Sequence, residues 1–265
     1  MKIRSAILLA LVVSMPQAFA AQEDTPPASK ALVDLKPGEV FKECPECPEM
    51  VVIPAGSFDM GSNEGSADEK PVHRVNIGKA FALGKTEVTQ DLWKAVTGDN
   101  PSRFKNCGDA CPVENVSWNE VQKFIKALNA KTGIQFRLPT EAEWEYACRA
   151  GGKHAYCGSD SLDEIGWHEG NSGNSTHPVC QKQANAFGLC DMSGSVWEWV
   201  EDSYYNNYNG APTDGTAWWG FRGMRVLRGG SWSDKAARSR ASSRLMSEQL
   251  FRNRFDGFRL ARTLP

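Results

Sequence analysis

The sequence lacks a strong excess of charge of either sign. Its 265 residues carry 30 Lys and Arg against 32 Asp and Glu, which gives a net charge of −2. Proteins that bind nucleic acids or anionic membrane surfaces through charge carry a clear excess of basic residues. The composition therefore argues against both kinds of partner.

The sequence also lacks an apolar run long enough to span a bilayer, which takes roughly 20 residues in a helix. The apolar run at residues 6–13 is shorter, follows Lys2 and Arg4, and precedes the small-x-small sequence Ala18-Phe-Ala20. This order is typical of a secretory signal peptide. We therefore predict a signal peptide at residues 1–20, a periplasmic or secreted mature chain, and no membrane span.

Histidine is scarce, and the four that are present lack the spacing of a zinc site. His168 stands beside Glu169, whereas a zinc-binding helix needs two histidines four residues apart. We interpret the histidines as loop residues. The alternative is that His168 or His177 acts as a general base in the long loop that contains both.

Cysteine is frequent up to residue 190 and absent after it. An even number of cysteines in an exported protein predicts disulfides, although the sequence does not choose the pairing. Joining neighbours predicts the bridges Cys44–Cys47, Cys107–Cys111, Cys148–Cys157 and Cys180–Cys190. The first pair also has redox-motif spacing, but the prolines around it disfavour the helix start that such a motif needs.

The remaining pattern predicts a single loop-rich α+β domain. Residues 21–43 are rich in Pro, Lys, Glu and Asp and predict a flexible segment, so we expect the domain at residues 44–265. Short apolar or alternating runs predict strands, and Ser117 and Thr140 begin capping boxes that predict helices. Long irregular stretches at residues 149–184 and 204–224 complete the α+β pattern. The expected strands are residues 50–53, 57–62, 72–77, 81–86, 136–138, the start of 225–232, and 258–262, and a further helix is expected between Thr89 and Gly98.

Residues 185–202 combine turn formers, two tryptophans and several acids. Asp191 and Glu198 lie on either side of the turn Ser193-Gly194-Ser195. A loop of this kind can fold carboxylate and carbonyl oxygens around a hard cation such as calcium. The alternative is the end of a strand whose acids face water.

The chain resembles the formylglycine-generating enzyme family, also called the sulfatase-modifying factor family. One matching motif is Arg-Leu-Pro-Thr-Glu-Ala-Glu-Trp-Glu-Tyr-Ala at residues 137–147. The resemblance implies a loop-rich variant of the C-type lectin fold, in agreement with the α+β pattern. The other matching motifs are residues 50–61, 87–89, 112–118, 185–202, 228–232 and 257–260.

The resemblance implies a structural calcium ion in the turn described above. Carried over by position, its ligands are the side chains of Asp191 and Glu198 and the backbone carbonyls of Gly194 and Val196. These are the oxygen ligands that calcium prefers. The family's second calcium site has a poor match, at about residues 167–174.

The resemblance does not extend to the family's copper centre. Active family members hold copper between two cysteines that follow the Gly-Gly-Ser motif, where this chain has Asp234 and Ser239. A two-thiolate Cu(I) site needs soft ligands, which a carboxylate and a hydroxyl do not replace. We therefore expect no copper centre and no copper-dependent oxygenase mechanism.

The same segment supplies the candidate groove residues. By resemblance, Ser231 and Trp232 match the wall of the family's active groove, and Asp234 and Arg238 follow them. Arginines nearby predict a positive patch, with ion pairing to acids as the alternative. These arginines are Arg228, Arg238, Arg240 and Arg244.

Two functions follow, and the sequence leaves the choice between enzyme and binding protein open. The first is oxidation or maturation of a peptide or protein substrate, or of a peptide-derived metabolite, without the thiol–copper mechanism. The second is a catalytically silent, lectin-like binding or accessory module for an exported partner. Formylglycine formation itself is the weakest hypothesis, because the last cysteine is Cys190.

Overall fold

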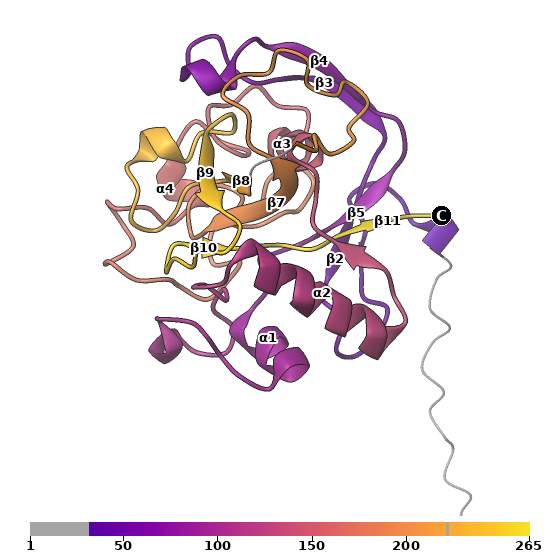
Figure 1. The fold of residues 1–265 in the computed structure, drawn as a ribbon, viewed down its shortest axis with the longest axis vertical. Helices are drawn as coiled ribbons and strands as arrows, with labels where there is room; N and C mark the ends of the chain where they lie inside the picture. The colour runs from indigo at the N-terminus through magenta and orange to yellow at the C-terminus, as the bar shows by residue number, and fades with distance from the viewer. Residues whose placement is uncertain (1–31, 221–222) are drawn as a thin grey trace, which may run out of the picture.

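The computed structural model describes residues 32–220 and 223–265, so the predicted signal peptide at residues 1–20 lies outside the described residues. Figure 1 shows strands grouped at the centre, with helices and long loops packed around them. The helices are α1 (Gln90–Thr97), α2 (Trp118–Thr132), α3 (Glu141–Arg149) and α4 (Leu162–Ile165). The strands are β1 (Val40–Phe41), β2 (Met50–Ile53), β3 (Gly56–Met60), β4 (His73–Ile77), β5 (Phe81–Gly84), β6 (Phe136–Arg137), β7 (Trp197–Ser203), β8 (Met224–Arg228), β9 (Arg244–Glu248), β10 (Asp256–Gly257) and β11 (Ala261–Thr263).

A five-stranded sheet with the order β1-β2-β5-β11-β6 lies between two hydrophobic cores. Successive side chains of a strand point to opposite faces. In β2, Met50 and Val52 enter one core, while Val51 and Ile53 enter the other. All four residues are buried, which explains why β2 is a continuous apolar run rather than an alternating one.

Helices α1 and α2 cover the core that contains Met50 and Val52 (Figure 1). The predicted capping box of α2 is present, because Ser117 accepts a hydrogen bond from the Glu120 backbone and Glu120 bonds back to Ser117. Trp93 of α1 stacks on Phe124 of α2, with ring centroids 4.9 Å apart. This aromatic contact fixes the two helices against each other and against the sheet.

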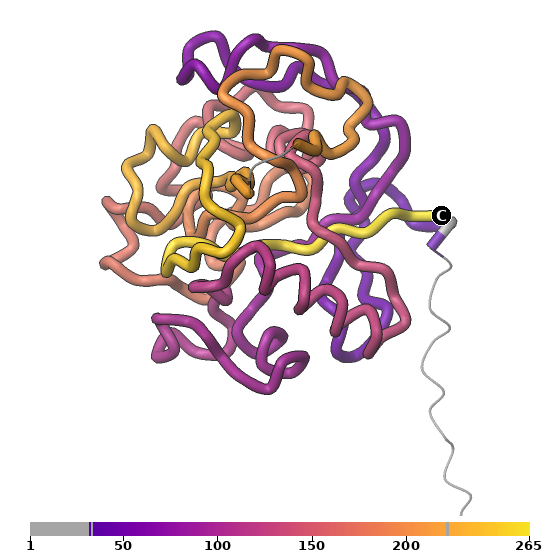
Figure 2. The backbone as a smooth tube through the Cα atoms, in the orientation of Figure 1, coloured from indigo at the N-terminus to yellow at the C-terminus, as the bar shows by residue number. Residues whose placement is uncertain are grey.

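A second sheet has the order β10-β7-β8-β9, and the turn of residues 185–196 leads into its strand β7. Helix α3 packs between this sheet and the hairpin β3–β4. Its predicted capping box, formed by Thr140 and Glu143, is also present. Figure 2 shows the yellow C-terminal segment beside the indigo N-terminal strands, where β11 pairs with β5.

Some predicted boundaries are wrong. The predicted final strand at residues 258–262 begins only at Ala261. Before it, the Phe258 and Leu260 carbonyls accept hydrogen bonds from the backbone N–H groups of Val88 and Gly84. The predicted flexible segment 21–43 includes β1, which pairs with β2. The sequence patterns also missed β9 and the short helix α4.

The four predicted disulfides are confirmed. Each bridge joins a cysteine to the next one in the sequence: Cys44–Cys47, Cys107–Cys111, Cys148–Cys157 and Cys180–Cys190. The last two lie at either end of the long irregular segment that holds α4. This segment therefore keeps a defined path without extended secondary structure.

Candidate functional site

The predicted calcium loop is a tight turn that leads into β7. Asp191, Gly194 and Ser195 all have positive φ values, of 57°, 85° and 62°. At Gly194 a Cβ atom would collide with the carbonyl of Trp167, so only glycine fits there. The turn therefore places Asp191 and Glu198 beneath the long loop rather than in water.

Glu198 is completely buried and its carboxylate is already engaged. Its two oxygens accept hydrogen bonds from the guanidinium of Arg259, both at 2.7 Å. The indole Nε1 of Trp144 donates to the same carboxylate at 2.8 Å. Glu198 thus ties the turn to α3 and to the C-terminal segment.

Asp191 has one carboxylate oxygen without a hydrogen-bond donor. Its Oδ2 accepts a hydrogen bond from the backbone N–H of Cys180 at 2.5 Å, while its Oδ1 is buried without a partner. Glu87 lies close by, with both carboxylate oxygens buried and unpartnered. Burial raises the pKa of Asp191 to about 6, and burial together with the Asp191 charge raises that of Glu87 well above its ordinary value.

We call Glu87, Asp191, Glu198 and Arg259 the acidic cluster. When ionised, its three carboxylates face a single guanidinium, and three of their oxygens lack a hydrogen-bond donor. A hard cation would satisfy the charge and the open oxygens of Glu87 and Asp191, whereas Glu198 is already paired with Arg259. Within the described ranges no group of three or more His, Cys, Asp or Glu side chains is arranged around a metal position. The predicted set needs only two carboxylates, and it stays a prediction.

A second buried group of charges differs in its pairing. We call Glu141, Glu145, Arg228 and Arg244 the paired cluster. Arg244 forms two hydrogen bonds with Glu141, at 2.6 and 2.9 Å, and Arg228 bonds to Glu145. Burial alone would raise the pKa of Glu141, but Arg244 and Arg228 hold it below the ordinary value.

The paired cluster settles the role of the predicted positive patch. Arg228 and Arg244 are buried among acids, and Arg240 bonds to buried Glu69. Of the four arginines, Arg238 is the most exposed, with half of its side chain in solvent. The alternative of ion pairing is therefore confirmed for all four, with buried acids as partners for three and with Asp234 for Arg238.

Residues 231–240, which we call the groove segment, are organised around the side chain of Asp234. Its Oδ2 accepts hydrogen bonds from the Ser231 hydroxyl at 2.5 Å, the Ser231 backbone N–H at 3.1 Å and the Trp197 indole at 2.8 Å. Arg238 Nε lies 3.9 Å from the other oxygen, Oδ1. Three donors on one oxygen hold the carboxylate in a fixed orientation and leave Oδ1 toward Arg238 and solvent.

The other groove candidates are less accessible. Ser231 and Trp232 are 1% and 3% exposed, so they support Asp234 rather than line an open surface. Ser239, at the second thiol position, is completely buried and its hydroxyl has no partner. Since neither Asp234 nor Ser239 is a soft ligand, the residues do not fit a two-thiolate copper centre.

Asp256 is a site residue that the sequence patterns missed. It pairs with Trp197 through the parallel β10–β7 ladder, and its Oδ1 is buried without a partner. Burial and the nearby Asp234 charge raise its pKa to about 8. The fixed carboxylate of Asp234 therefore lies near a carboxyl group, that of Asp256, which keeps its proton at neutral pH.

The two candidate histidines are held by other contacts. His168 Nε2 lies 2.9 Å from an oxygen of Asp163. His177 stacks on Trp167 and its Nε2 lies 2.7 Å from the Ser172 carbonyl. These contacts support the interpretation of both as loop residues.

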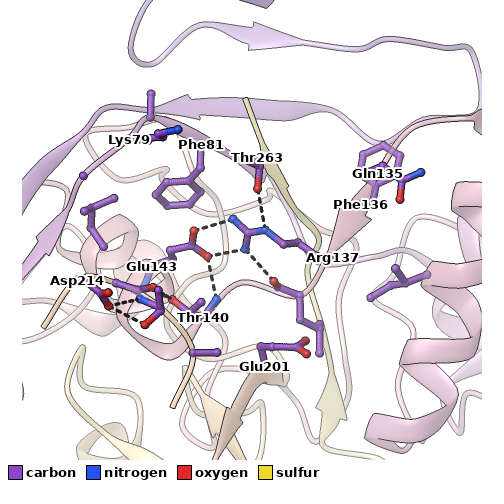
Figure 3. A pocket seen from close by; sticks show the side chains of 18 of the residues that line it. Lys79, Phe81, Gln135, Phe136, Arg137, Thr140, Glu143, Glu201, Asp214 and Thr263 are labelled. Atoms are coloured by element: carbon purple, nitrogen blue, oxygen red, sulfur yellow. Dashed lines mark hydrogen bonds and ion pairs between the residues drawn. The ribbon is translucent and has the colours of Figure 1, made fainter. Parts of the chain in front are cut away.

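A cavity of about 800 Å³ opens elsewhere, between α2, β6 and the loop of residues 214–217 (Figure 3). Figure 3 shows the Arg137 guanidinium directed at the Glu143 carboxylate, with hydrogen bonds of 2.6 and 2.7 Å. Phe81 and Phe136 supply apolar walls. Its polar groups bond mainly to one another, and none of the predicted site residues lines it.

No helix within the described residues is long and apolar enough to cross a bilayer.

Comparison with known proteins identifies relatives over most of the chain. A family model for the "Sulfatase-modifying factor enzyme 1-like domain" matches residues 36–264. "Chaperone protein LppX" of Paenibacillus barcinonensis is 30% identical and covers 69% of this chain and 78% of its own. The formylglycine-generating enzyme of Mycobacterium tuberculosis is 26% identical, over 60% of this chain and 76% of its own. The solved structure of PvdO from Pseudomonas aeruginosa has 35% identity and a TM-score of 0.78, over 87% of this chain and 100% of that one.

Proposed function

Because the chain belongs to the sulfatase-modifying factor family, we propose that it acts in the oxidation or maturation of a peptide or protein substrate without the thiol–copper mechanism. Membership confirms the predicted resemblance and the C-type-lectin-like α+β fold. The observation that carries the proposal is Asp234, a carboxylate held by three donors where the resemblance places the first thiol.

The chemistry available at this position is proton transfer. Oδ1 of Asp234 can accept a proton or hydrogen bond from a substrate N–H or O–H group, because the donors occupy Oδ2. Asp256 is buried and keeps its proton at neutral pH, since its pKa is about 8, so it adds no second negative charge beside Asp234. Asp234 is therefore the candidate base at this position.

The proposal is tested by incubating the mature protein with a periplasmic peptide extract and comparing products by mass spectrometry. Wild type should change the mass of at least one peptide, and Asp234→Asn should lose that change. Asp214→Asn, on an exposed loop, is the matched control and should retain it. Identical profiles for wild type and Asp234→Asn would refute an Asp234-dependent reaction.

Formylglycine formation needs its own test. We expect no aldehyde when the protein is supplied with copper and a Cys-Xaa-Pro-Xaa-Arg peptide, because the soft ligands are missing. Detection of the aldehyde by hydrazide labelling would show that the residues after Gly230 support the family reaction in another way.

A second candidate function is a binding or accessory module for an exported partner. It is favoured by the burial of Ser231 and Trp232, which leaves little reactive surface in the groove segment. Affinity capture with the mature chain, followed by capture with Asp234→Asn, separates the two functions. A partner bound equally by both proteins, with no altered product, would favour the binding module.

We also propose that the chain works in the periplasm or outside the cell and carries a structural calcium ion. Four disulfides support the location, because such bridges persist in oxidising compartments. The surplus of carboxylates in the acidic cluster supports the ion. Fractionation of cells that express the tagged full-length chain tests the location, and its recovery in a reduced form from the cytoplasm would contradict it.

A further inference from the structure

A surface pocket of about 710 Å³ beside Trp232 concentrates positive charge. Four basic side chains line it: Arg103, Lys105, Arg252 and Arg254. The other lining residues are neutral, and no Asp or Glu is among them. This local excess contrasts with the whole chain, whose net charge is −2.

Three of the four charges are not neutralised by ion pairs. Arg252 pairs with Glu120. Among the described residues, no carboxylate lies within 4.0 Å of the charged groups of Arg103, Lys105 or Arg254. The Arg254 guanidinium instead lies over the rings of Phe255 and Trp232, at 4.9 and 5.5 Å. Stacking holds the guanidinium in place and leaves its N–H donors for a ligand.

The two walls of the pocket are fastened to each other by Asn115. Its backbone N–H donates to the Asn253 carbonyl at 3.0 Å, and its side chain donates to the Pro101 carbonyl at 2.9 Å. Asn115 has a φ of 64°, which allows it to reach both segments. A pocket with fixed walls needs little rearrangement to bind a ligand.

One acid lies beneath the pocket. Glu114 is fully buried, and its Oε1 accepts a hydrogen bond from the Phe104 backbone N–H at 2.8 Å. Burial raises its pKa to about 7, although Arg103 and Arg254 oppose the rise. Its charge is partial at neutral pH and does not cancel those of the three unpaired basic residues.

The pocket adjoins the groove segment. Trp232 Nε1 donates to the Arg254 carbonyl at 3.4 Å, and the Trp232 ring meets the Phe104 ring edge-on, with centroids 5.1 Å apart. Trp232 follows Ser231 directly and lies two residues before Asp234. Trp232 therefore connects the basic pocket to the segment that holds Asp234.

We propose that this pocket binds an acidic segment of the peptide substrate, through its carboxylates, while the reacting part of the substrate contacts Asp234. The inference rests on the proposed function for its substrate class, a peptide. Leu250 and Phe251, which are 71% and 55% exposed, precede the basic wall and offer an apolar contact to the same segment. Carboxylates match the fork of arginine donors, which accounts for the choice of an acidic ligand.

The experiment measures fluorescence anisotropy of a labelled peptide, Asp-Glu-Leu-Asp-Glu-Phe, with the mature disulfide-bonded protein. A second peptide, Asn-Gln-Leu-Asn-Gln-Phe, tests the need for charge. We expect the acidic peptide to bind about tenfold more tightly than the neutral one, and Arg103→Glu with Lys105→Glu to remove about tenfold in affinity. Both residues are exposed, so the double variant should keep the wild-type melting temperature.

The matched control is Lys79→Glu with Lys126→Glu, which changes the charge equally at the cavity of Figure 3. It should bind the acidic peptide as wild type does. Equal binding of the two peptides, or an equal loss in both double variants, would overturn the proposal. Stronger binding to phosphatidylglycerol vesicles than to the peptide, lost in the Arg103 and Lys105 variant, would assign the pocket to a lipid surface instead. Anisotropy does not require turnover, so a chain that modifies no peptide can still pass this test.

Discussion

The two buried charge clusters contain the same chemical groups in different proportions. In the paired cluster, every carboxylate oxygen of Glu141 and Glu145 accepts a hydrogen bond from an arginine or another donor. In the acidic cluster, Glu198 is the one carboxylate that accepts hydrogen bonds from Arg259, and Glu87 has no donor on either oxygen. The chain itself supplies a donor to every carboxylate oxygen of the paired cluster, whereas the open oxygens of the acidic cluster need protons or a cation.

The difference shows in the direction of the pKa shifts. Glu141 has a lowered pKa although it is buried, because two arginines favour its charged form. Glu87 and Asp191 have raised pKa values, because burial is not offset. Carboxyl groups that are equally buried thus have pKa values shifted in opposite directions, and the number of neighbouring arginines decides the direction.

The largest expected effect comes from breaking the paired cluster. Arg228→Met should lower the free energy of unfolding by about 3–5 kcal/mol, because it leaves buried carboxylates without their partner. Urea denaturation measures this loss. The control is Arg74→Met, whose pair with Asp59 is exposed and should contribute about 0–1 kcal/mol. Equal effects of the two substitutions would mean that Arg228 adds nothing beyond a surface pair.

The next effect is that of calcium on the acidic cluster. Calcium at 100 times its dissociation constant should stabilise the fold by about 2.7 kcal/mol. For a domain of this size that is roughly 5–10 °C in melting temperature. Thermal unfolding with calcium and with chelator measures the shift, which Asp191→Asn should abolish.

The control for calcium is Asp160→Asn, an exposed acid in the long loop, which should retain the shift. A wild-type melting curve that is the same with chelator and with calcium would reject the ion. The acidic cluster would then hold its excess carboxylates in the protonated form.

The smallest effect concerns Asp256, a buried carboxyl without any arginine partner. Its pKa is about 8 in the folded protein and about 3.9 in an unfolded chain, so the folded state binds the proton more tightly between these values. This contribution to stability is present at low pH and is lost as the pH rises toward 8. Asp256→Asn should therefore lose less stability than wild type between about pH 5.5 and about pH 7, by on the order of 2 kcal/mol.

Urea denaturation of both proteins across this pH range gives the comparison. Asp59→Asn, at an exposed position, should follow the wild-type curve. If Asp256→Asn also follows the wild-type curve, the pKa of Asp256 is not raised in the folded protein, and Asp256 is not a buried, protonated acid.

Features encoded within a few residues were predictable from the sequence. The capping boxes at Ser117 and Thr140 need only a residue and its third neighbour, and both formed as predicted. The disulfides between neighbouring cysteines follow the same local logic. Strand β2 was predictable because a short apolar run before Pro54 has few other structures available.

Contacts between distant residues were not predictable. Arg244 and Glu141 are 103 residues apart, and Arg259 and Glu198 are 61 apart, so no spacing rule joins them. Arg228 therefore suggested a surface patch, although it is a core residue. Asp256 has no local signal either, since its burial depends on the parallel pairing of β10 with β7.

The pairing of neighbouring cysteines bears on how the chain matures. The four bridges close in sequence order, with separations of 3, 4, 9 and 10 residues. A chain that enters an oxidising compartment from its N-terminus presents each cysteine with its native partner before the next pair arrives. In a chain exported in this way, oxidation in order of arrival would give the native pairing without any bridge being broken and remade. Strand β11, which lies between β5 and β6, arrives last, and its insertion into the sheet completes the domain.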